Sequence, residues 1–184
     1  MRRLISLSVL FLAACGAPGA GRTTVTAAVP VTTQVSTGAG ELRVSANNES
    51  RETTHVLTMN TADAWSALPG VYHQLGLEGQ VLDADARFFG TRRQTVSGRL
   101  AGVRLATYLD CGQGNGGLPI ANTYRVSLSV GTRVEEMGGR AQLRSGLIAE
   151  ASPATVSGPE VRCTSTGRLE ARIAELMNGG TTGR

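Results

Sequence analysis

The segment RVSLSVGTRV, from Arg125 to Val134, has the clearest strand pattern in this chain. Apolar side chains at Val126, Leu128 and Val130 alternate with polar ones, which is typical of a strand with one face in a core and one toward water. The segment from Arg140 to Ala151 repeats the alternation. Because Met137-Gly138-Gly139 between them suits a tight turn, we expect a long antiparallel hairpin.

Four shorter segments have strand character. They are Thr53 to Met59, Gln80 to Phe89, Arg92 to Val96, and Glu160 to Thr164. We expect a hairpin turn around Gly90-Thr91 and a loop from Ser97 to about Pro119.

Two segments have the periodicity of amphipathic helices. The first follows a cap near Asn60 or Thr61 and contains Pro69, and an interior proline costs roughly 3 kcal/mol unless the helix kinks or restarts there. Its apolar face comprises Trp65, Leu68, Tyr72 and Leu75, and Gly76 and Gly79 follow. The second begins at Ser165-Thr166 and places Leu169, Ile173 and Leu176 on one face, with Glu170, Arg172 and Glu175 outside. The order of elements predicts an α+β fold: an antiparallel sheet of about five to six strands with two helices packed on one face.

The N-terminus has the organisation of an export signal. Arg2 and Arg3 form a basic region, and the apolar run that follows ends in Leu12-Ala13-Ala14-Cys15. This run is far shorter than the roughly 20 residues of a spanning helix. It resembles the lipobox of bacterial lipoproteins.

The resemblance implies a lipid anchor. Residues 1–14 would be the signal peptide, and Cys15 would become the first mature residue, with a diacylglycerol on its sulfur and an acyl chain such as palmitate on its amino group. Two or more acyl chains anchor a protein stably. The chain would then lie in the cell envelope, and Gly16 in place of Asp is compatible with the outer membrane, facing the periplasm, in a Gram-negative cell.

Composition divides the remaining chain. Residues 15–40 are rich in Gly, Ala, Thr, Val and Pro with a single charge at Arg22, which predicts a flexible tether. Residues 41–178 have the size of one α+β domain, and residues 179–184 form a polar tail that we expect to be disordered.

Two cysteines remain once Cys15 is assigned to lipid. In an exported chain, Cys111 and Cys163 are most simply a structural disulfide. A metal site would need further ligands at short spacing, and a redox pair would normally place its cysteines two residues apart.

The basic residues exclude several function classes. All 18 are Arg, so the phosphate-loop lysine, the Schiff-base lysine and the Ser-x-x-Lys nucleophile are absent. Without Arg2 and Arg3, 16 arginines face 14 acidic residues, a net charge of +2. Arg92-Arg93 is the only later basic doublet and reads as solvated surface, so we expect no binding of nucleic acid.

Candidate sites on the domain are few. The loop Asp110-Cys111-Gly112-Gln113-Gly114-Asn115-Gly116-Gly117 lacks the Gly-Lys-Ser/Thr of a phosphate loop, but Gly112, Gly114, Asn115 and Gly116 make it a possible binding loop. A metal site could in principle combine His55, His73, Asp83 and Asp85, although their spacing does not require one. No Gly-x-Ser-x-Gly elbow is present. We therefore expect no catalytic residues, no metal and no cofactor.

Two further resemblances concern the domain. Its order of elements is weakly similar to the small lipoprotein domains of the outer-membrane β-barrel assembly machinery. It also resembles a recurring type of envelope lipoprotein, through Ala64-Trp65 with Leu68, Asp110-Cys111-Gly112 and the segment from Cys163 to Glu170. No activity follows from either resemblance.

The leading hypothesis is a membrane-anchored, non-catalytic envelope lipoprotein whose domain binds a protein partner, for instance as an accessory to assembly. The alternative is a small-ligand carrier with a pocket between the sheet and the Trp65 helix. A hydrolase or metal enzyme using Asp83 and Asp85 is the third hypothesis.

Overall fold

The structure is a computed structural model that describes residues 31–37, 40–46, 52–154 and 158–179. The predicted signal peptide 1–14, Cys15 and the residues of the tail beyond Gly179 lie outside the described residues.

The elements follow one another along the chain as strands, helices and short 3-10 turns. They are β1 (Val31–Thr37), β2 (Gly40–Ala46), β3 (Thr53–Val56), α1 (Thr61–Gln74), β4 (Gln80–Asp83), β5 (Phe88–Ser97), β6 (Arg99–Leu100), β7 (Val103–Arg104), η1 (Leu105–Thr107), β8 (Leu109–Asp110), η2 (Asn115–Gly117), α2 (Ile120–Thr123), β9 (Arg125–Met137), β10 (Arg140–Ser152), β11 (Val161–Ser165) and α3 (Arg168–Met177).

The main sheet is antiparallel, which confirms the predicted α+β fold. Seven strands form it in the order β4-β5-β9-β10-β11-β8, and β3 also pairs with β10. In the described chain, β1 and β2 pair with each other in a separate sheet, as do β6 and β7. Because β1 begins at Val31, part of the segment predicted as a tether is paired in this hairpin, and residues 15–30 lie outside the described residues.

The long hairpin forms where the alternation predicts it. β9 pairs with β10 without a break from Met137↔Arg140 to Arg125↔Ser152. The connecting residues Gly138 and Gly139 have φ of 59° and 79°. Two successive residues with positive φ make the type I′ turn that matches the twist of the strands, and glycine adopts it without a steric penalty.

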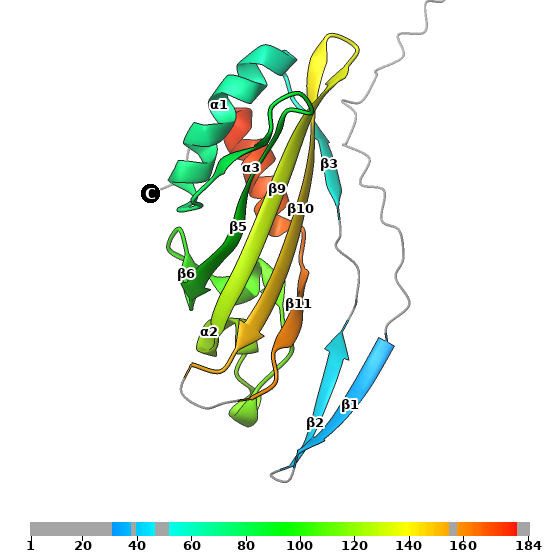
Figure 1. Cartoon of the computed structure of the whole chain (residues 1–184), viewed down its shortest axis with the longest axis vertical. Coiled ribbons are helices and arrows are strands. Elements are labelled where there is room, and N and C mark those ends of the chain that lie inside the picture. Colours follow the sequence, from blue (N-terminus) through cyan, green and yellow to red (C-terminus); the bar gives the residue numbers. More distant parts are fainter. Residues whose placement is uncertain (1–30, 38–39, 47–51, 155–157, 180–184) are drawn as a thin grey trace, which may run out of the picture.

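The two longer helices, α1 and α3, lie on one face of this sheet (Figure 1). The Oδ1 atom of Asn60 caps α1 by accepting the Asp63 N–H at 2.9 Å, and the helix continues past Pro69 to Gln74. The Tyr72 hydroxyl is 2.9 Å from Thr132 Oγ1, which is 3.0 Å from Ser145 Oγ. This buried chain of hydroxyls joins α1 to β9 and β10 inside an otherwise apolar core.

The core consists of side chains from the helices and from the facing side of the sheet. Its largest fully buried members include Leu57, Leu68, Tyr72, Ile120, Leu128, Leu143, Leu147, Leu169 and Ile173.

The turn between β4 and β5 corrects one prediction. It spans residues 84–87, where Asp83 Oδ1 accepts the Ala86 N–H at 2.9 Å, and not Gly90-Thr91. Gly90 lies inside β5, paired with Gln80 on one side and Gly131 on the other. A Cβ on Gly90 would be 2.3 Å from the Val130 carbonyl oxygen. This glycine therefore permits a close approach of strands and does not form a turn.

The side chain of Glu170 corrects a second prediction, that this residue lies on the outer face of the last helix. It is fully buried, although its charge and position predict an exposed residue. The Ser165 hydroxyl donates to Glu170 Oε1 at 2.6 Å, and Ser165 Oγ accepts the Gly167 N–H at 3.0 Å. A carboxyl group can be buried when hydrogen bonds of this kind replace its water, so the residue belongs to the start of α3 and to the core.

The predicted loop from Ser97 to Pro119 contains several short elements. They are β6, β7, η1, β8 and η2, with the single-turn helix α2 directly after them. Local periodicity cannot reveal such short segments, because two or three residues show no repeat.

Candidate functional site

Three glycines cross the open face of the sheet, opposite the helices. Gly90 in β5 pairs with Gly131 in β9, and Gly131 pairs with Gly146 in β10. Residues paired directly across antiparallel strands share one face. The three positions therefore form a row without side chains, which we call the glycine row.

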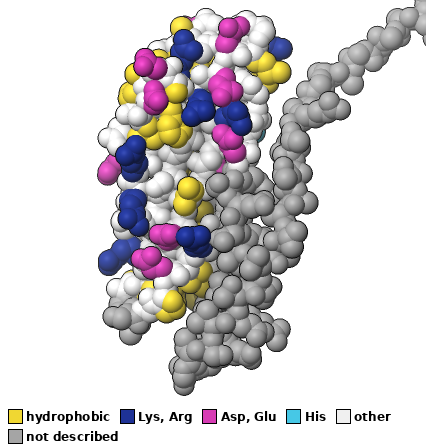
Figure 2. Space-filling view, turned by 45° about the vertical axis from the view of Figure 1, so that its right-hand side comes forward, with side chains coloured by type: hydrophobic (Ala, Val, Ile, Leu, Met, Phe, Trp, Pro, Cys, Tyr) yellow, Lys and Arg dark blue, Asp and Glu magenta, His cyan; other side chains and the backbone are white. Residues whose placement is uncertain are grey.

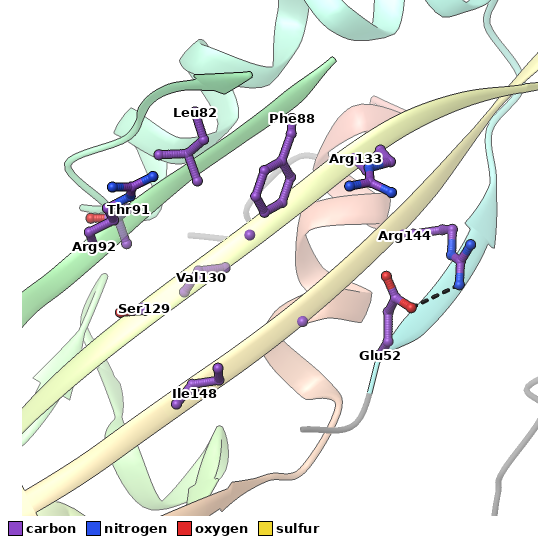
Figure 3. Close-up of a pocket in the computed structure, with 12 residues that line it drawn as sticks. Glu52, Leu82, Phe88, Thr91, Arg92, Ser129, Val130, Arg133, Arg144 and Ile148 are labelled. Atoms are coloured by element: carbon purple, nitrogen blue, oxygen red, sulfur yellow. Dashed lines mark hydrogen bonds and ion pairs between the residues drawn. The ribbon is translucent and has the colours of Figure 1, made fainter. Parts of the chain in front are cut away.

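The glycine row is open at one end. Leu82 lies over Gly90, and the Phe88 ring lies over Gly131, because a Cβ on either glycine would approach these side chains within 3 Å. At Gly146 a Cβ would meet nothing within 4 Å. The result is a hollow of about 470 Å³ above the middle of β9 and β10 (Figure 3).

Apolar side chains border the hollow on two sides. Phe88 and Leu82 lie at one border, and Ile148 lies at the other (Figure 3). Ile148 is 61% exposed. An exposed face of an antiparallel sheet is usually polar, whereas here Ile148, Phe88 and Leu82 together place apolar surface around one hollow, which makes this part of the face a candidate binding surface.

Arginines surround the apolar part. The Arg133 guanidinium lies 5.5 Å from the centroid of the Phe88 ring, a cation–π distance. Arg144 contacts Glu52 at 2.9 Å and Glu135 at 3.7 Å. Within the described residues, neither Arg92 nor Arg133 forms an ion pair. Figure 2 shows the surrounding surface, where basic, acidic and hydrophobic side chains are interspersed.

The basic doublet reaches this face through a β-bulge. The pairing shifts between Thr91 and Gln94, so Arg92 and Arg93 together oppose Ser129. Arg93 has a positive φ of 50°, and its N–H donates to Ser129 Oγ at 2.9 Å. A bulge redirects side chains, and here it brings Arg92 to the hollow while Arg93 contacts Glu150 at 3.7 Å. Reading the doublet as plain solvated surface missed this placement, since nothing local in the sequence signals a bulge.

The register could have revealed the glycine row. Gly131 and Gly146 are equally far from the turn residues Gly138 and Gly139, so they must pair once that turn is predicted. Gly90 gives no such signal, because the sequence predicts a turn around Gly90-Thr91.

The predicted binding loop lies beside the disulfide, at a distance from the hollow. Cys111 and Cys163 are bonded, with sulfur atoms 2.00 Å apart. The Gly112 N–H donates to Asp110 Oδ1 at 2.9 Å, and the Gly114 N–H donates to the Leu118 carbonyl at 2.8 Å. Those two N–H groups are therefore already used within the loop, whose role in binding stays a prediction that also includes Asn115 and Gly116.

A second hollow of about 470 Å³ adjoins this loop. Its lining includes Arg99, Arg104, Leu118, Pro119 and Asn122. Leu118 is 58% exposed, but Asn122 is occupied, since its Oδ1 accepts the Ala106 N–H at 2.9 Å.

Aromatic rings pack between α1 and the sheet, where the alternative hypothesis expects a ligand pocket. The Phe89 ring is 5.0 Å from that of Tyr72 and 6.3 Å from that of Trp65, both edge-to-face. Such pairs contribute about 0.5 to 1.5 kcal/mol each beyond the area that they bury.

The four candidate metal ligands do not form a single cluster. His55 lies on β3 and His73 on α1, while Asp83 ends β4 and Asp85 is in the following turn. In the part of the chain that the structure describes, no three His, Cys, Asp or Glu side chains form a group that could hold a metal ion.

Among the described residues, three side chains on the helix side of the sheet have shifted pKa values. Burial lowers the pKa of His55, against the effect of the Glu175 carboxylate. Burial also raises the pKa values of Tyr72 and Tyr108. The Nε2 atom of His55 is buried and has no hydrogen-bond partner among the described residues.

None of the described helices has the length and apolar character needed to cross a membrane. Comparisons with family models, with curated proteins and with solved structures give no match for this chain.

Proposed function

We propose that this protein is a lipid-anchored envelope lipoprotein whose domain binds a protein partner through the open face of its sheet, without catalysing a reaction. The lipobox at Leu12-Ala13-Ala14-Cys15 supports the anchor. The observation that carries the binding role is the hollow over Gly146, which the exposed Ile148 and several arginines border on a face that none of the described helices covers.

The chemistry around the hollow supports binding over catalysis. Its side chains supply guanidinium groups, a carboxylate, hydroxyls and apolar surface. The Ser129 hydroxyl already accepts the Arg93 N–H. A serine nucleophile needs an adjacent base, and the two histidines of the chain lie elsewhere, on β3 and α1.

Photo-crosslinking in intact cells tests this function. A photoreactive amino acid replaces Ile148 on the open face or, as the matched control, the exposed Ala67 on α1. We expect one discrete crosslinked protein from position 148 and none from position 67. Failure of position 148 to crosslink, or the same product from both positions, would contradict the proposal.

A Cys15→Ala variant connects the anchor to the partner. An unanchored chain samples the partner at a much lower effective concentration, so the crosslinked product from position 148 should fall at least tenfold. An unchanged yield would show that the anchor does not contribute to partner binding.

A further inference from the structure

We propose that the partner docks through an acidic, extended segment that lies across β9 and β10 over the glycine row. An apolar side chain of that segment occupies the space above Gly146, and its carboxylates pair with Arg92 and Arg133. This inference rests on the proposed function and names the chemistry of its partner.

The width of the hollow suits one extended chain. Arg144 and Ile148 each lie two residues from Gly146 on the same face of β10. At about 3.3 Å per residue, the two side chains are about 13 Å apart along the strand. The glycines between these borders let the docked backbone approach the sheet closely.

The charges select an acidic segment. Arg93 and Arg144 already contact glutamates, whereas Arg92 and Arg133 have no carboxylate partner among the described residues. These two guanidiniums lie on opposite sides of Phe88 (Figure 3). A planar guanidinium binds a carboxylate through two parallel hydrogen bonds, so both positions favour Asp or Glu of a partner.

The apolar surface of the hollow favours an apolar residue between the acidic residues of the partner segment. Phe88 and Ile148 face the hollow from opposite borders, and nothing would contact a Cβ at Gly146. A leucine, isoleucine or phenylalanine of the partner would remove this surface from water. Burial of one large apolar side chain at the centre of an interface contributes most to affinity, which makes it the anchor of the contact.

Three other occupants fit the face less well. A second copy would present Glu52, Glu135 and Glu150, but each of these already contacts an arginine of its own chain, so they are not free to pair with Arg92 and Arg133. The tether of this chain carries Arg22 and no acidic residue, so it supplies no carboxylate. An anionic membrane is flat, leaves the hollow unfilled and would approach Glu52, Glu135 and Glu150 as well as the arginines.

A peptide-display selection tests the inference. The full-length chain in non-ionic detergent is the bait, and the library displays random 12-residue peptides. We expect the bound pool to be enriched at least threefold in Asp and Glu over the input library, around a central apolar residue. A pool without acidic enrichment would overturn the inference.

Matched variants place the binding on the glycine row. Gly146→Val fills the hollow at a position with free space, and Arg92→Glu reverses a charge. Each variant should bind the selected peptides with at least tenfold lower affinity. The controls Thr95→Val and Arg125→Glu lie on exposed strand positions away from the hollow and should change the affinity less than twofold. If Gly146→Val does not fold, Ile148→Ser takes its place. Equal affinities in variants and controls would overturn the inference.

The remaining outcomes separate this inference from the proposed function. Co-sedimentation of the chain with anionic phosphatidylglycerol vesicles, or dimerisation, either one abolished by Arg92→Glu, would overturn the acidic segment. A crosslinked partner at position 148 together with a non-acidic peptide pool would overturn this inference alone. Absence of any crosslink at position 148 would overturn the proposed function itself.

Discussion

The ring of Phe88 occupies the space that a side chain on Gly131 would need. A Cβ at position 131 would lie 2.7 Å from both Cε2 and Cζ of that ring. At Gly146, the next member of the glycine row, the corresponding space is empty. One aromatic side chain thus covers part of the row and leaves the part that forms the hollow.

Substitutions at Gly131 and Gly146 should therefore change the free energy of unfolding in opposite directions. Gly131→Ala displaces the Phe88 ring and weakens its contact with Arg133, so we expect a loss of about 1 to 3 kcal/mol in the free energy of unfolding. Gly146→Ala meets no atom and reduces the freedom of the unfolded chain, so it should be neutral or stabilise by up to about 1 kcal/mol. Urea denaturation measures both; equal effects would contradict the different surroundings of the two glycines.

The disulfide should contribute a large share of the stability. Cys111 and Cys163 are 52 residues apart in the sequence. The chain-entropy model gives roughly 4 kcal/mol for closing a loop of that length. The double variant Cys111→Ala, Cys163→Ala should lose about this amount in urea denaturation, and reductant should destabilise the wild type but not the variant. A loss below about 1 kcal/mol would contradict this role.

The stability of the fold should depend on the hydrogen bond between Ser165 and the buried Glu170. Replacing Ser165 with Ala removes the hydroxyl that donates to Glu170 at 2.6 Å and accepts the Gly167 N–H. A buried acceptor that loses its hydrogen-bond donor costs about 1 to 3 kcal/mol. The exposed Thr58, whose hydroxyl donates to Asn178, is the matched control, and Thr58→Ala should cost less than about 1 kcal/mol. Similar losses of stability in the two variants would contradict the prediction that the Ser165 hydrogen bond to the buried Glu170 is worth more than an exposed one.

Stability should fall on mild acidification because of His55. Burial lowers the pKa of His55 in the folded chain below its ordinary value of 6.5. The unfolded chain therefore binds the proton more readily, and the free energy of unfolding decreases as the pH falls from 6.5 toward the folded pKa. The difference in unfolding free energy between pH 7.5 and pH 5.5 should be smaller in His55→Gln than in the wild type. An unchanged difference would contradict the role of His55.

Much of the fold could be predicted because its main elements bury one face. The alternation in Arg125 to Val134 and the spacing of Leu169, Ile173 and Leu176 both report which side meets the core. Burial patterns of this kind are local in sequence, so β9, β10 and α3 follow from them directly.

The site could not be predicted in the same way, because it depends on register and on a bulge. Gly90 reads as a turn residue, and only its pairing with Gly131 shows that it lies inside the sheet. Arg92 reads as a solvated residue, and only the shift opposite Ser129 brings it to the hollow. Contacts between strands far apart in sequence decide both positions.

The envelope location and the proposed partner both require the lipid anchor at Cys15, which intact-mass spectrometry of the chain from a native-type host would reveal. We predict the mass of residues 15–184 plus diacylglycerol and an acyl chain, rising by about two hydrogens when the Cys111–Cys163 bond is reduced. The Cys15→Ala variant should carry no acyl mass. An unprocessed wild-type chain with three free thiols would contradict the anchor, the envelope location and the proposed partner together.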